Sequence, residues 1–376
     1  MLRLAFRQIR LDSGRSVLTC VGIAAVLAVI LVLQGFQQGL YRQLEDVALA
    51  RNADLIATQA GVTNMVAARS VIPQMVRERV EAVDGVKLAH PMTALSLIYE
   101  KDGKKTAVFL TVTETRGGPS QTIQGRLIQN DGEVVIDRAL AQHYGLTPGQ
   151  DLVIAGYPFK IVGVTETTAA MFTSFVFTNF GSLIDFYFET KLADDISAFP
   201  LLSYLLIELE PGADRQVVKD RVEKAVADVD VFLPETIAKN DEQLGRTMFG
   251  AVLAILIGVA YIAGALVVAL FMFSAAEARR RDLGVLKAIG FPNRALLGSI
   301  VVETVLLTVA AVPLGIALAM GLAAGIHAAM PTYLVLPTIA GPLIATIVAC
   351  AFFALLGAVG PFRLIKNLEP AEVFQS

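Results

Sequence analysis

The chain has 376 residues, of which 55% are hydrophobic and only 17% are charged, and its formal net charge is -3. Its mean hydropathy is +0.62, whereas average soluble proteins are about 25% charged. Charged residues are nearly absent from four long stretches, which excludes an ordinary soluble globular protein and indicates an integral membrane protein. We therefore expect membrane lipid around the chain and no nucleic-acid partner.

The N-terminal region predicts a membrane entrance on the cytoplasmic side. Residues 1–15 place arginines among apolar residues, a pattern typical of a basic amphipathic segment at the headgroup level. The uncharged run at 16–41 predicts the first span and the base of a stalk. A cleaved signal peptide is the alternative, but the apolar core is longer than usual and no small-residue cleavage site follows it. The stripe Phe36, Leu40, Leu44 could contact a lipid-like substrate or pack between two helices of a dimer.

Residues 42–247 predict a separate mixed α/β domain. Charged residues return there, acidic ones outnumber basic ones, and short alternating runs are separated by turn signals. The segment is long enough to have its own core. Its fold within residues 94–130 stays open, apart from one strand. The expected strands are 53–58, 106–112, 133–136, 151–155, 159–164 and 204–209, and the expected helices are 73–83, 137–144 and 213–229.

The second half predicts three further spans. The helical pattern from Glu235 to Phe273 covers roughly 60 Å at about 1.5 Å per residue, about twice the hydrocarbon core, so this helix also extends as a stalk. No Lys or Arg occurs between Ala295 and Phe362, and basic residues on both sides require an even number of crossings. The expected segments are the second span at 248–273, an inner loop at 274–295, the third span at 296–328, an outer loop at 329–337, the fourth span at 338–361 and a cytoplasmic tail at 362–376.

The fold class expected from these segments is an α-helical membrane protein with four transmembrane helices. A mixed α/β extracytoplasmic domain is inserted between the first and second spans on helical stalks. The positive-inside rule places both termini in the cytoplasm.

Motifs for catalysis and for cofactors are not found in the sequence. No Gly-x-x-x-x-Gly-Lys-Ser/Thr loop is present, so we expect no nucleotide site, and no nucleophile–base pair stands out. The three histidines show no spacing typical of a zinc site. Cys20 and Cys350 both lie in apolar runs, which argues against a structural disulfide. The chain is expected not to be an enzyme and to bind no cofactor or metal.

The inner loop at 274–295 has more sequence features than a simple connection between two spans requires. Leu283, Leu286 and Ile289 recur at helical spacing, and Gly290 followed by Pro292 predicts the end of that helix. Any inner loop tends to be basic, but this tendency does not explain a defined helix with a stop signal. We expect the helix to dock a cytoplasmic partner.

At this loop the sequence resembles the FtsX/MacB family of ABC transporter permeases, whose motif is approximately Arg-Arg-Glu-Ile-Gly-x-Leu-Arg-Ala-x-Gly. Asp282 and Lys287 depart from the motif while keeping its charge, although Lys cannot reproduce a bidentate Arg contact. The motif positions are occupied by Arg280, Arg281, Asp282, Leu283, Gly284, Leu286, Lys287, Ala288 and Gly290.

Glu303 matches an acidic position that this family often has at the start of the following helix. Carboxylates inside a membrane are rare and serve ion sites or proton relays by default. The alternative is a structural role, in which Glu303 reaches interfacial water or pairs with a basic residue such as Arg294.

The resemblance implies a permease that dimerises with a second copy or a paralogue and docks on cytoplasmic ABC ATPase subunits, which hold ATP and magnesium. ATP-driven closure would move the stalks by mechanotransmission. The size is most like that of the MacB/DevC exporter type in the bacterial inner membrane, which works with a membrane-fusion protein and an outer-membrane channel. Its substrate would be lipid-like, a peptide or a small molecule.

Two other functions stay open within the same architecture. One is a lipoprotein-releasing permease of the LolC/LolE type. The other is a non-transporting regulator like FtsX, which controls a cell-wall hydrolase. A plain secondary transporter is disfavoured, because the four spans hold hardly any ionisable side chain besides Glu303.

Overall fold

The computed structural model describes residues 13–66, 68–166, 170, 172–190, 201–278 and 280–357. The predicted amphipathic segment, up to residue 12, and the predicted tail at 362–376 lie outside the described residues. The chain divides into two compact units. The membrane unit contains Gly250–Ile326 with the segments up to Gln38 and from Val335 onward, and the second unit contains Gly39–Phe249 and His327–Leu334.

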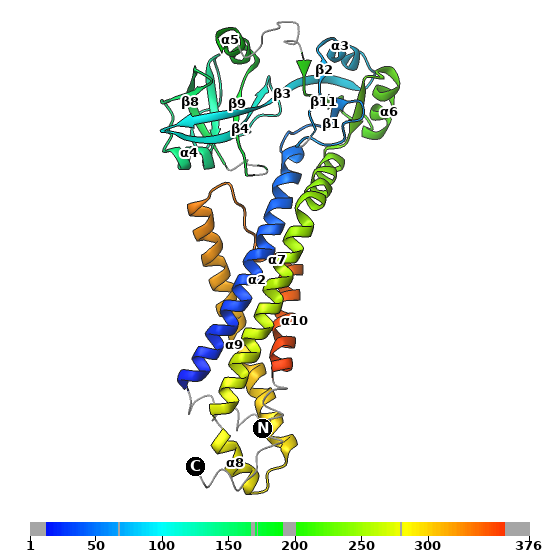
Figure 1. Ribbon diagram of the computed structural model, residues 1–376. Coiled ribbons are helices and arrows are strands. Elements are labelled where there is room, and N and C mark those ends of the chain that lie inside the picture. Colours follow the sequence, from blue (N-terminus) through cyan, green and yellow to red (C-terminus); the bar gives the residue numbers. More distant parts are fainter. Residues whose placement is uncertain are drawn as a thin grey trace. The chain divides into compact units, whose positions relative to one another are not determined.

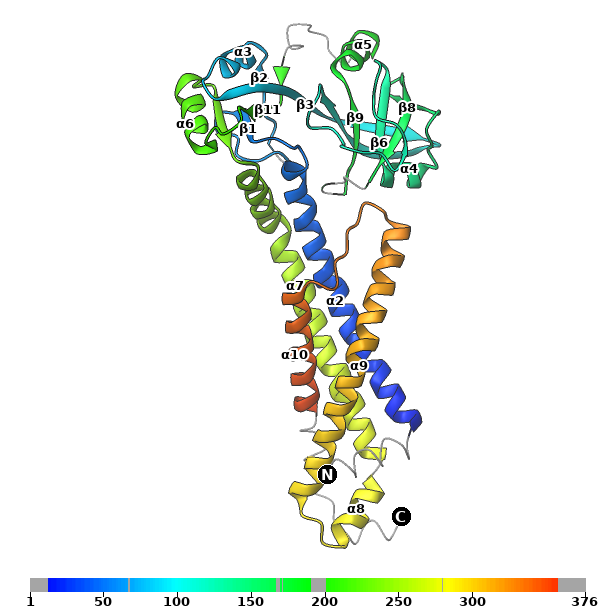
Figure 2. The same cartoon turned by 180° about the vertical axis from the view of Figure 1, so that it is seen from behind.

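The membrane unit is built from long apolar helices. Among the described residues, four helices are long and apolar enough to cross a membrane. Figures 1 and 2 show α2 running alongside α7 within this unit. The four are α2 (Ser13–Leu49), α7 (Pro234–Ala278), α9 (Asn293–Ala329) and α10 (Ala340–Gly357). The expected four spans are confirmed, and α10 is described as far as residue 357.

Small residues allow these helices to approach closely. A Cβ added to Gly315 on α9 would lie 2.7 Å from Leu27 Cδ2 on α2, and one added to Gly357 on α10 would lie 3.1 Å from the Cα of Ala269 on α7. Packing of this kind drives helix association in a membrane. Lipid tails are as apolar as the helix surface, so the hydrophobic effect does not favour helix–helix contacts there. Substituting either glycine would force two helices apart.

The inserted domain is a mixed α/β fold, as expected. One sheet has the strand order β12-β1-β11-β3-β4-β9-β6-β8-β5, with β7 paired to β3 and β8. Its strands are β1 (Leu55–Gln59), β3 (Val86–Lys101), β4 (Lys104–Thr113), β5 (Gln124–Gly125), β6 (Glu133–Asp137), β7 (Asp151–Ile154), β8 (Tyr157–Thr165), β9 (Ser174–Thr178), β11 (Tyr204–Leu209) and β12 (Val229–Phe232). A second, two-stranded sheet pairs β2 (Ile72–Pro73) with β10 (Leu201–Leu202).

The long strand β3 joins two lobes of this domain (Figures 1 and 2). In the first lobe, helices α3 (Met75–Glu81) and α6 (Arg215–Ala225) pack on β1 and β11, with Val80 and Val222 fully buried. The second lobe contains β6, β8, β9 and helices α4 (Arg138–Tyr144) and α5 (Phe180–Thr190), around a separate cluster of buried apolar residues. Each lobe therefore has its own core.

One predicted element of the first lobe is wrong at its end. The helix expected at 213–229 ends at Ala225, and Val229 instead begins strand β12. Val229 pairs with Gln59 of β1 and is buried. The sheet edge supplies backbone hydrogen bonds and burial that the local helical pattern could not reveal. An element is present at each of the other expected strands and helices. The elements that were not predicted are helix α5 and strands β2, β3, β5, β9, β10 and β12.

The apolar stripe on α2 is internal packing. Leu40 and Leu44 are each 2% exposed within this single chain. Gly245 of α7 faces Leu44 so closely that an added Cβ would lie 2.2 Å from Leu44 Cδ1. For these two leucines both expected roles, contact with a substrate and packing between two copies, are wrong.

A buried carboxylate organises the start of β6. Glu133 accepts hydrogen bonds from Arg126 Nη1 (2.7 Å) and Nη2 (2.5 Å), from the backbone N–H groups of Gln129 and Asn130, and from the side-chain amide of Asn130. These donors, Arg126 first, hold the pKa of Glu133 well below its ordinary value of 4.5. A carboxylate with a depressed pKa stabilises the folded state above the unfolded pKa and loses that contribution as the pH falls.

We therefore expect Glu133→Gln to lower the thermal midpoint at pH 7 and to do so less as the pH falls below about 4.5. Thermal unfolding of both proteins between pH 3 and pH 7 measures this difference. Asp151→Asn is a suitable control, since Asp151 forms only an exposed pair with Lys160 and such pairs contribute little. A deficit in Glu133→Gln that stays constant over the whole range would contradict the assignment.

Candidate functional sites

The helix expected in the inner loop is present as α8 (Arg280–Ala288). It ends as the sequence predicts. Gly290 has φ +96°, the left-handed region that favours glycine. The N–H of Gly290 donates to the Lys287 carbonyl (3.0 Å) and that of Phe291 donates to the Leu286 carbonyl (3.1 Å). This pair of bonds is the Schellman arrangement, which fixes where the helix stops.

The surface of α8 has a cationic start and an apolar middle. Arg280 and Arg281 are exposed, Leu286 and Lys287 are half-buried, and Gly284 is buried. Arg280 also lies 3.5 Å from Glu277. Ala288 is exposed near the end of the helix, while the side chains of Asp282 and Leu283 lie outside the description. The structure thus brings the motif residues onto one short helix, and their docking role stays a prediction.

Glu303 lies on α9, within the membrane unit. It is 7% exposed, so it is covered by protein. Its neighbour Thr304 donates to the Ile300 carbonyl at 2.8 Å and lies 3.6 Å from the sulfur of Met272 on α7. Burial between helices favours a structural role for Glu303. The expected partner Arg294 has a side chain outside the description, so that pairing stays a prediction.

A hydrogen-bonded cluster inside the membrane unit was not foreseen. Gln34 of α2 donates to the hydroxyl of Tyr261 on α7 (2.9 Å), and Thr346 of α10 donates to Gln34 Oε1 (2.7 Å). Polar side chains between helices act as adhesive contacts in lipid. Gln34, at the end of an apolar run, was the available signal, but its two partners are more than 200 residues away in the chain.

The comparisons with known proteins agree on one family. The model of the MacB-like periplasmic core domain matches residues 19–225, more than half of the chain. The model of the FtsX-like permease C-terminal domain matches residues 251–370. The chain belongs to the FtsX/MacB-like family of ABC transporter permeases.

Full-length relatives carry the same description. An uncharacterized ABC transporter permease of Mycobacterium tuberculosis is 26% identical over 381 residues, covering 100% of this chain and 99% of its own. A second one from that organism is 22% identical over 378 residues, with the same coverage. Among solved structures, the extracellular domain of YknZ has a TM-score of 0.36 at 13% identity, and covers 48% of this chain and 100% of its own. The periplasmic region of MacB from Actinobacillus actinomycetemcomitans has a TM-score of 0.37 at 12% identity, and covers 54% of this chain and 98% of its own.

In this permease, the far end of α2 is anchored in the inserted domain by a buried arginine. Arg51 follows α2, is 3% exposed, and donates to the carbonyls of Val47 (2.9 Å) and Gly117 (2.6 Å). Its guanidinium lies 5.3 Å from the ring centroid of Phe175 and 5.7 Å from that of Phe177. Burial lowers the pKa of Arg51 to about 10. The group therefore stays charged at neutral pH, held by carbonyls and aromatic faces.

Helix α7 is likewise anchored in the inserted domain, by the buried carboxylate of Asp241. Asp241 lies before the uncharged part of α7, which begins at Thr247, and is 0% exposed. Its carboxylate accepts from the backbone N–H of Met65 (3.1 and 3.2 Å) and of Val66 (3.2 Å). Tyr204 donates to the Met65 carbonyl at 3.0 Å. Asp241 and Arg51 were not singled out from the sequence. Each is a single charged residue near an apolar helix, and such a residue is only weak evidence of an anchor.

The described residues offer no constellation for catalysis. No group of three or more His, Cys, Asp or Glu side chains among them is arranged to hold a metal ion. Features of the described residues that bear on function include α8, the two anchors at the ends of α2 and α7, and a pocket of the inserted domain described below.

Proposed function

We propose that this ABC transporter permease transmits the ATP-driven movement of a separate cytoplasmic ATPase to its inserted domain, and thereby exports a lipid-like, peptide or small-molecule substrate. The observation that carries the proposal is the pair of helices α2 and α7. Each is unbroken, belongs to the membrane unit at one end and to the inserted unit at the other, and has a buried anchor at its far end. Such helices suit the transmission of force better than the formation of a pore.

Helix α8 is the proposed input of this movement. Its exposed arginines and its apolar middle suit a groove on the ATPase, with charged contacts guiding the association. ATP and magnesium would be held by the partner, because this sequence has no phosphate-binding loop. A dimer with a second copy or a paralogue would present two such helices to two ATPase subunits.

The proposed setting is the bacterial inner membrane, with both termini in the cytoplasm and the inserted domain outside. The distribution of basic residues supports this orientation. A membrane-fusion protein and an outer-membrane channel would complete an exporter of the MacB/DevC type. We place lipoprotein release second, because β3 and β4 are joined by the tight turn Asp102-Gly103, with φ +53° and +75° as in a two-residue hairpin. That connection leaves no long insertion between β3 and β4.

Affinity purification of the full chain in mild detergent, with identification of what accompanies it, tests the proposal. An ATPase together with a membrane-fusion protein is the expected result. An ATPase with a cell-wall hydrolase would favour an FtsX-like regulator, and one with lipoproteins alone would favour the LolC/LolE type. Purification without any ATPase would overturn the assignment of α8.

A further inference from the structure

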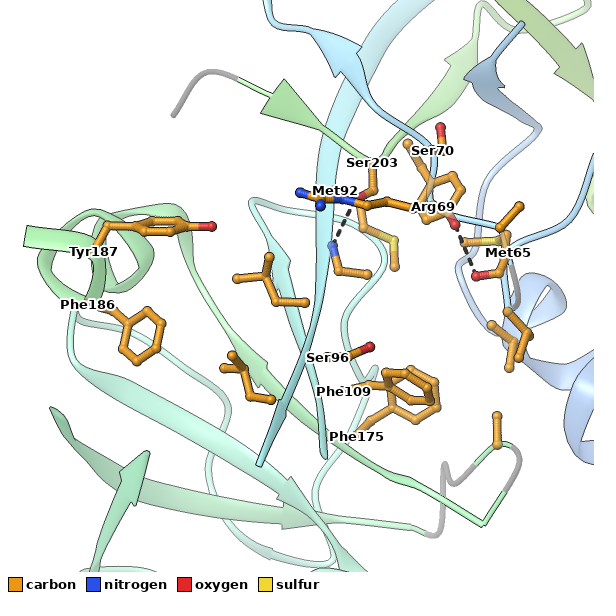
Figure 3. Close-up of a pocket in the computed structure, with 18 residues that line it drawn as sticks. Met65, Arg69, Ser70, Met92, Ser96, Phe109, Phe175, Phe186, Tyr187 and Ser203 are labelled. Atoms are coloured by element: carbon orange, nitrogen blue, oxygen red, sulfur yellow. Dashed lines mark hydrogen bonds between the residues drawn. The ribbon is translucent and has the colours of Figure 1, made fainter. Parts of the chain in front are cut away.

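The inserted domain contains a pocket of about 420 Å³ that lies against β3. This volume is in the range of about 300–1,000 Å³ typical of small-molecule sites. Its walls come from both lobes, from the loop 65–70 and from β11, as Figure 3 shows. The lining combines polar and apolar groups, and its larger apolar side chains include Met65, Met92, Phe109, Phe175 and Phe186.

Among the described residues that line this pocket, Arg69 is the one with a cationic side chain. Arg69 lines it and is exposed, and in Figure 3 its side chain extends from the loop toward Tyr187. Burial raises the pKa of Tyr187, while the charge of Arg69 acts on it in the opposite direction. Among the described residues no carboxylate lies within ion-pairing distance of Arg69. An arginine beside apolar walls, without an acid to neutralise it, is a donor suited to an anionic ligand group.

Two serines add polar groups near Arg69. Ser70 accepts from the backbone N–H of Gln59 at 2.8 Å, and Ser203 accepts from that of Ala94 at 3.1 Å. Because each hydroxyl already accepts from the backbone, its own hydrogen stays directed elsewhere. Figure 3 shows Arg69, Ser70 and Ser203 close together, beside Met65 and Met92, while the aromatic rings of Phe109, Phe175 and Phe186 lie farther along the pocket. This asymmetry fits a ligand with a polar head and an apolar tail.

Both stalk helices contact the walls of the pocket. Val47 of α2 lines it directly. On the other helix, Asp241 holds the backbone of Met65 and Val66, and both of those residues line the pocket. A displacement of α7 relative to α2 would thus move one wall against another.

We propose that this pocket binds a single-chain amphiphile with an anionic head, whose alkyl chain lies among the aromatic and methionine side chains while the head pairs with Arg69. Binding stands on the geometry of the pocket alone. That the stalks open and close the pocket, and that its ligand is the exported substrate, rests on the proposed function. A carboxylate and a phosphate share the chemistry that Arg69 recognises.

Photo-crosslinking of the full chain in phosphatidylcholine nanodiscs tests the binding. Three probes share a dodecyl chain with a terminal diazirine and differ in the head, which is a carboxylate, a phosphate monoester or an uncharged alcohol. Labelled peptides are identified by mass spectrometry. We expect the anionic probes to label peptides that contain Met92 and Phe109, and the alcohol to label them up to about fivefold less, as expected when an ion pair at an exposed position is lost. The stronger anionic probe identifies the type of head.

Two variants and one control sharpen the test. Arg69→Gln, at an exposed position, should reduce anionic labelling up to about fivefold and leave the weaker labelling by the alcohol unchanged. Ser96→Trp, which fills the edge of the pocket, should reduce labelling by every probe. Arg79→Gln changes another exposed arginine of this domain and should change nothing.

Equal labelling by the alcohol and the anionic probes, or undiminished labelling of Arg69→Gln, would overturn the assignment of an anionic head. Labels confined to the spans would overturn the pocket itself. Neither result bears on whether an ATPase accompanies the purified chain, so the two proposals can fail separately.

Discussion

Leu286→Arg is expected to separate the permease from its ATPase while leaving it in the membrane. Leu286 is half-buried in the middle of α8 and belongs to the apolar face of that helix. An arginine there would place an unpaired charge against the partner's groove, so the amount of ATPase recovered with the permease should fall at least about tenfold. Gly284→Trp should have the same effect, because Gly284 is buried within this chain and a large side chain there would displace α8.

Quantitative co-purification with equal amounts of inserted permease measures this loss. Val285→Arg is the matched control. It introduces the same charge at an adjacent residue that is 38% exposed and lies about 100° around the helix from Leu286. Recovery of normal amounts of ATPase with both Leu286→Arg and Gly284→Trp would remove the docking assignment. Equal loss in Val285→Arg would show that α8 tolerates no added charge and does not present one docking face.

Leu244→Pro is expected to uncouple ATP hydrolysis from movement of the inserted domain. Leu244 lies in α7 between the anchor Asp241 and Gly245, which packs on Leu44 of α2. A proline within a helix removes one backbone hydrogen bond, clashes with the preceding turn and costs about 3 kcal/mol. The resulting bend would absorb the displacement of the membrane end of α7 before it reached the anchor.

Distances between spin labels on the two copies of a dimer, measured with and without ATP and vanadate, report this movement. A label at Met75→Cys suits the purpose, since Met75 is 78% exposed and the native Cys20 and Cys350 can be replaced. The unsubstituted stalk should show a change in distance that Leu244→Pro abolishes while ATP is still hydrolysed. Leu244→Ala preserves the helix and should behave normally. An unchanged response in Leu244→Pro would exclude α7 as the transmitting element.

The inserted domain shows where sequence patterns reach their limit. A helix was predicted over 137–144 with Gly145 as its stop, and α4 forms there, with Asp137 accepting from the Ala139 N–H at 2.6 Å and Gly145 in the left-handed conformation. Both signals are local. Strand β12 has no such local signal, because its pairing with β1 brings together residues about 170 positions apart in the chain.

The candidate sites divide in the same way. Helix α8 could be located in the sequence because its ends and its motif occupy one continuous stretch. The pocket could not, since Arg69, Met92, Phe175 and Tyr187 come from four separate elements. The polar cluster of Gln34, Tyr261 and Thr346 likewise depends on three helices that only packing brings together.

The sequence by itself determined the four spans, the presence of a mixed α/β domain between the first two, and the short helix of the inner loop. These follow from hydropathy, helix period and stop signals, which act over a few turns of chain. Only the tertiary structure decided the strand order, the anchors Arg51 and Asp241, and the pocket beside β3. Each of these exists because distant segments bury surface and satisfy buried polar groups together, and that energy is absent from any single segment.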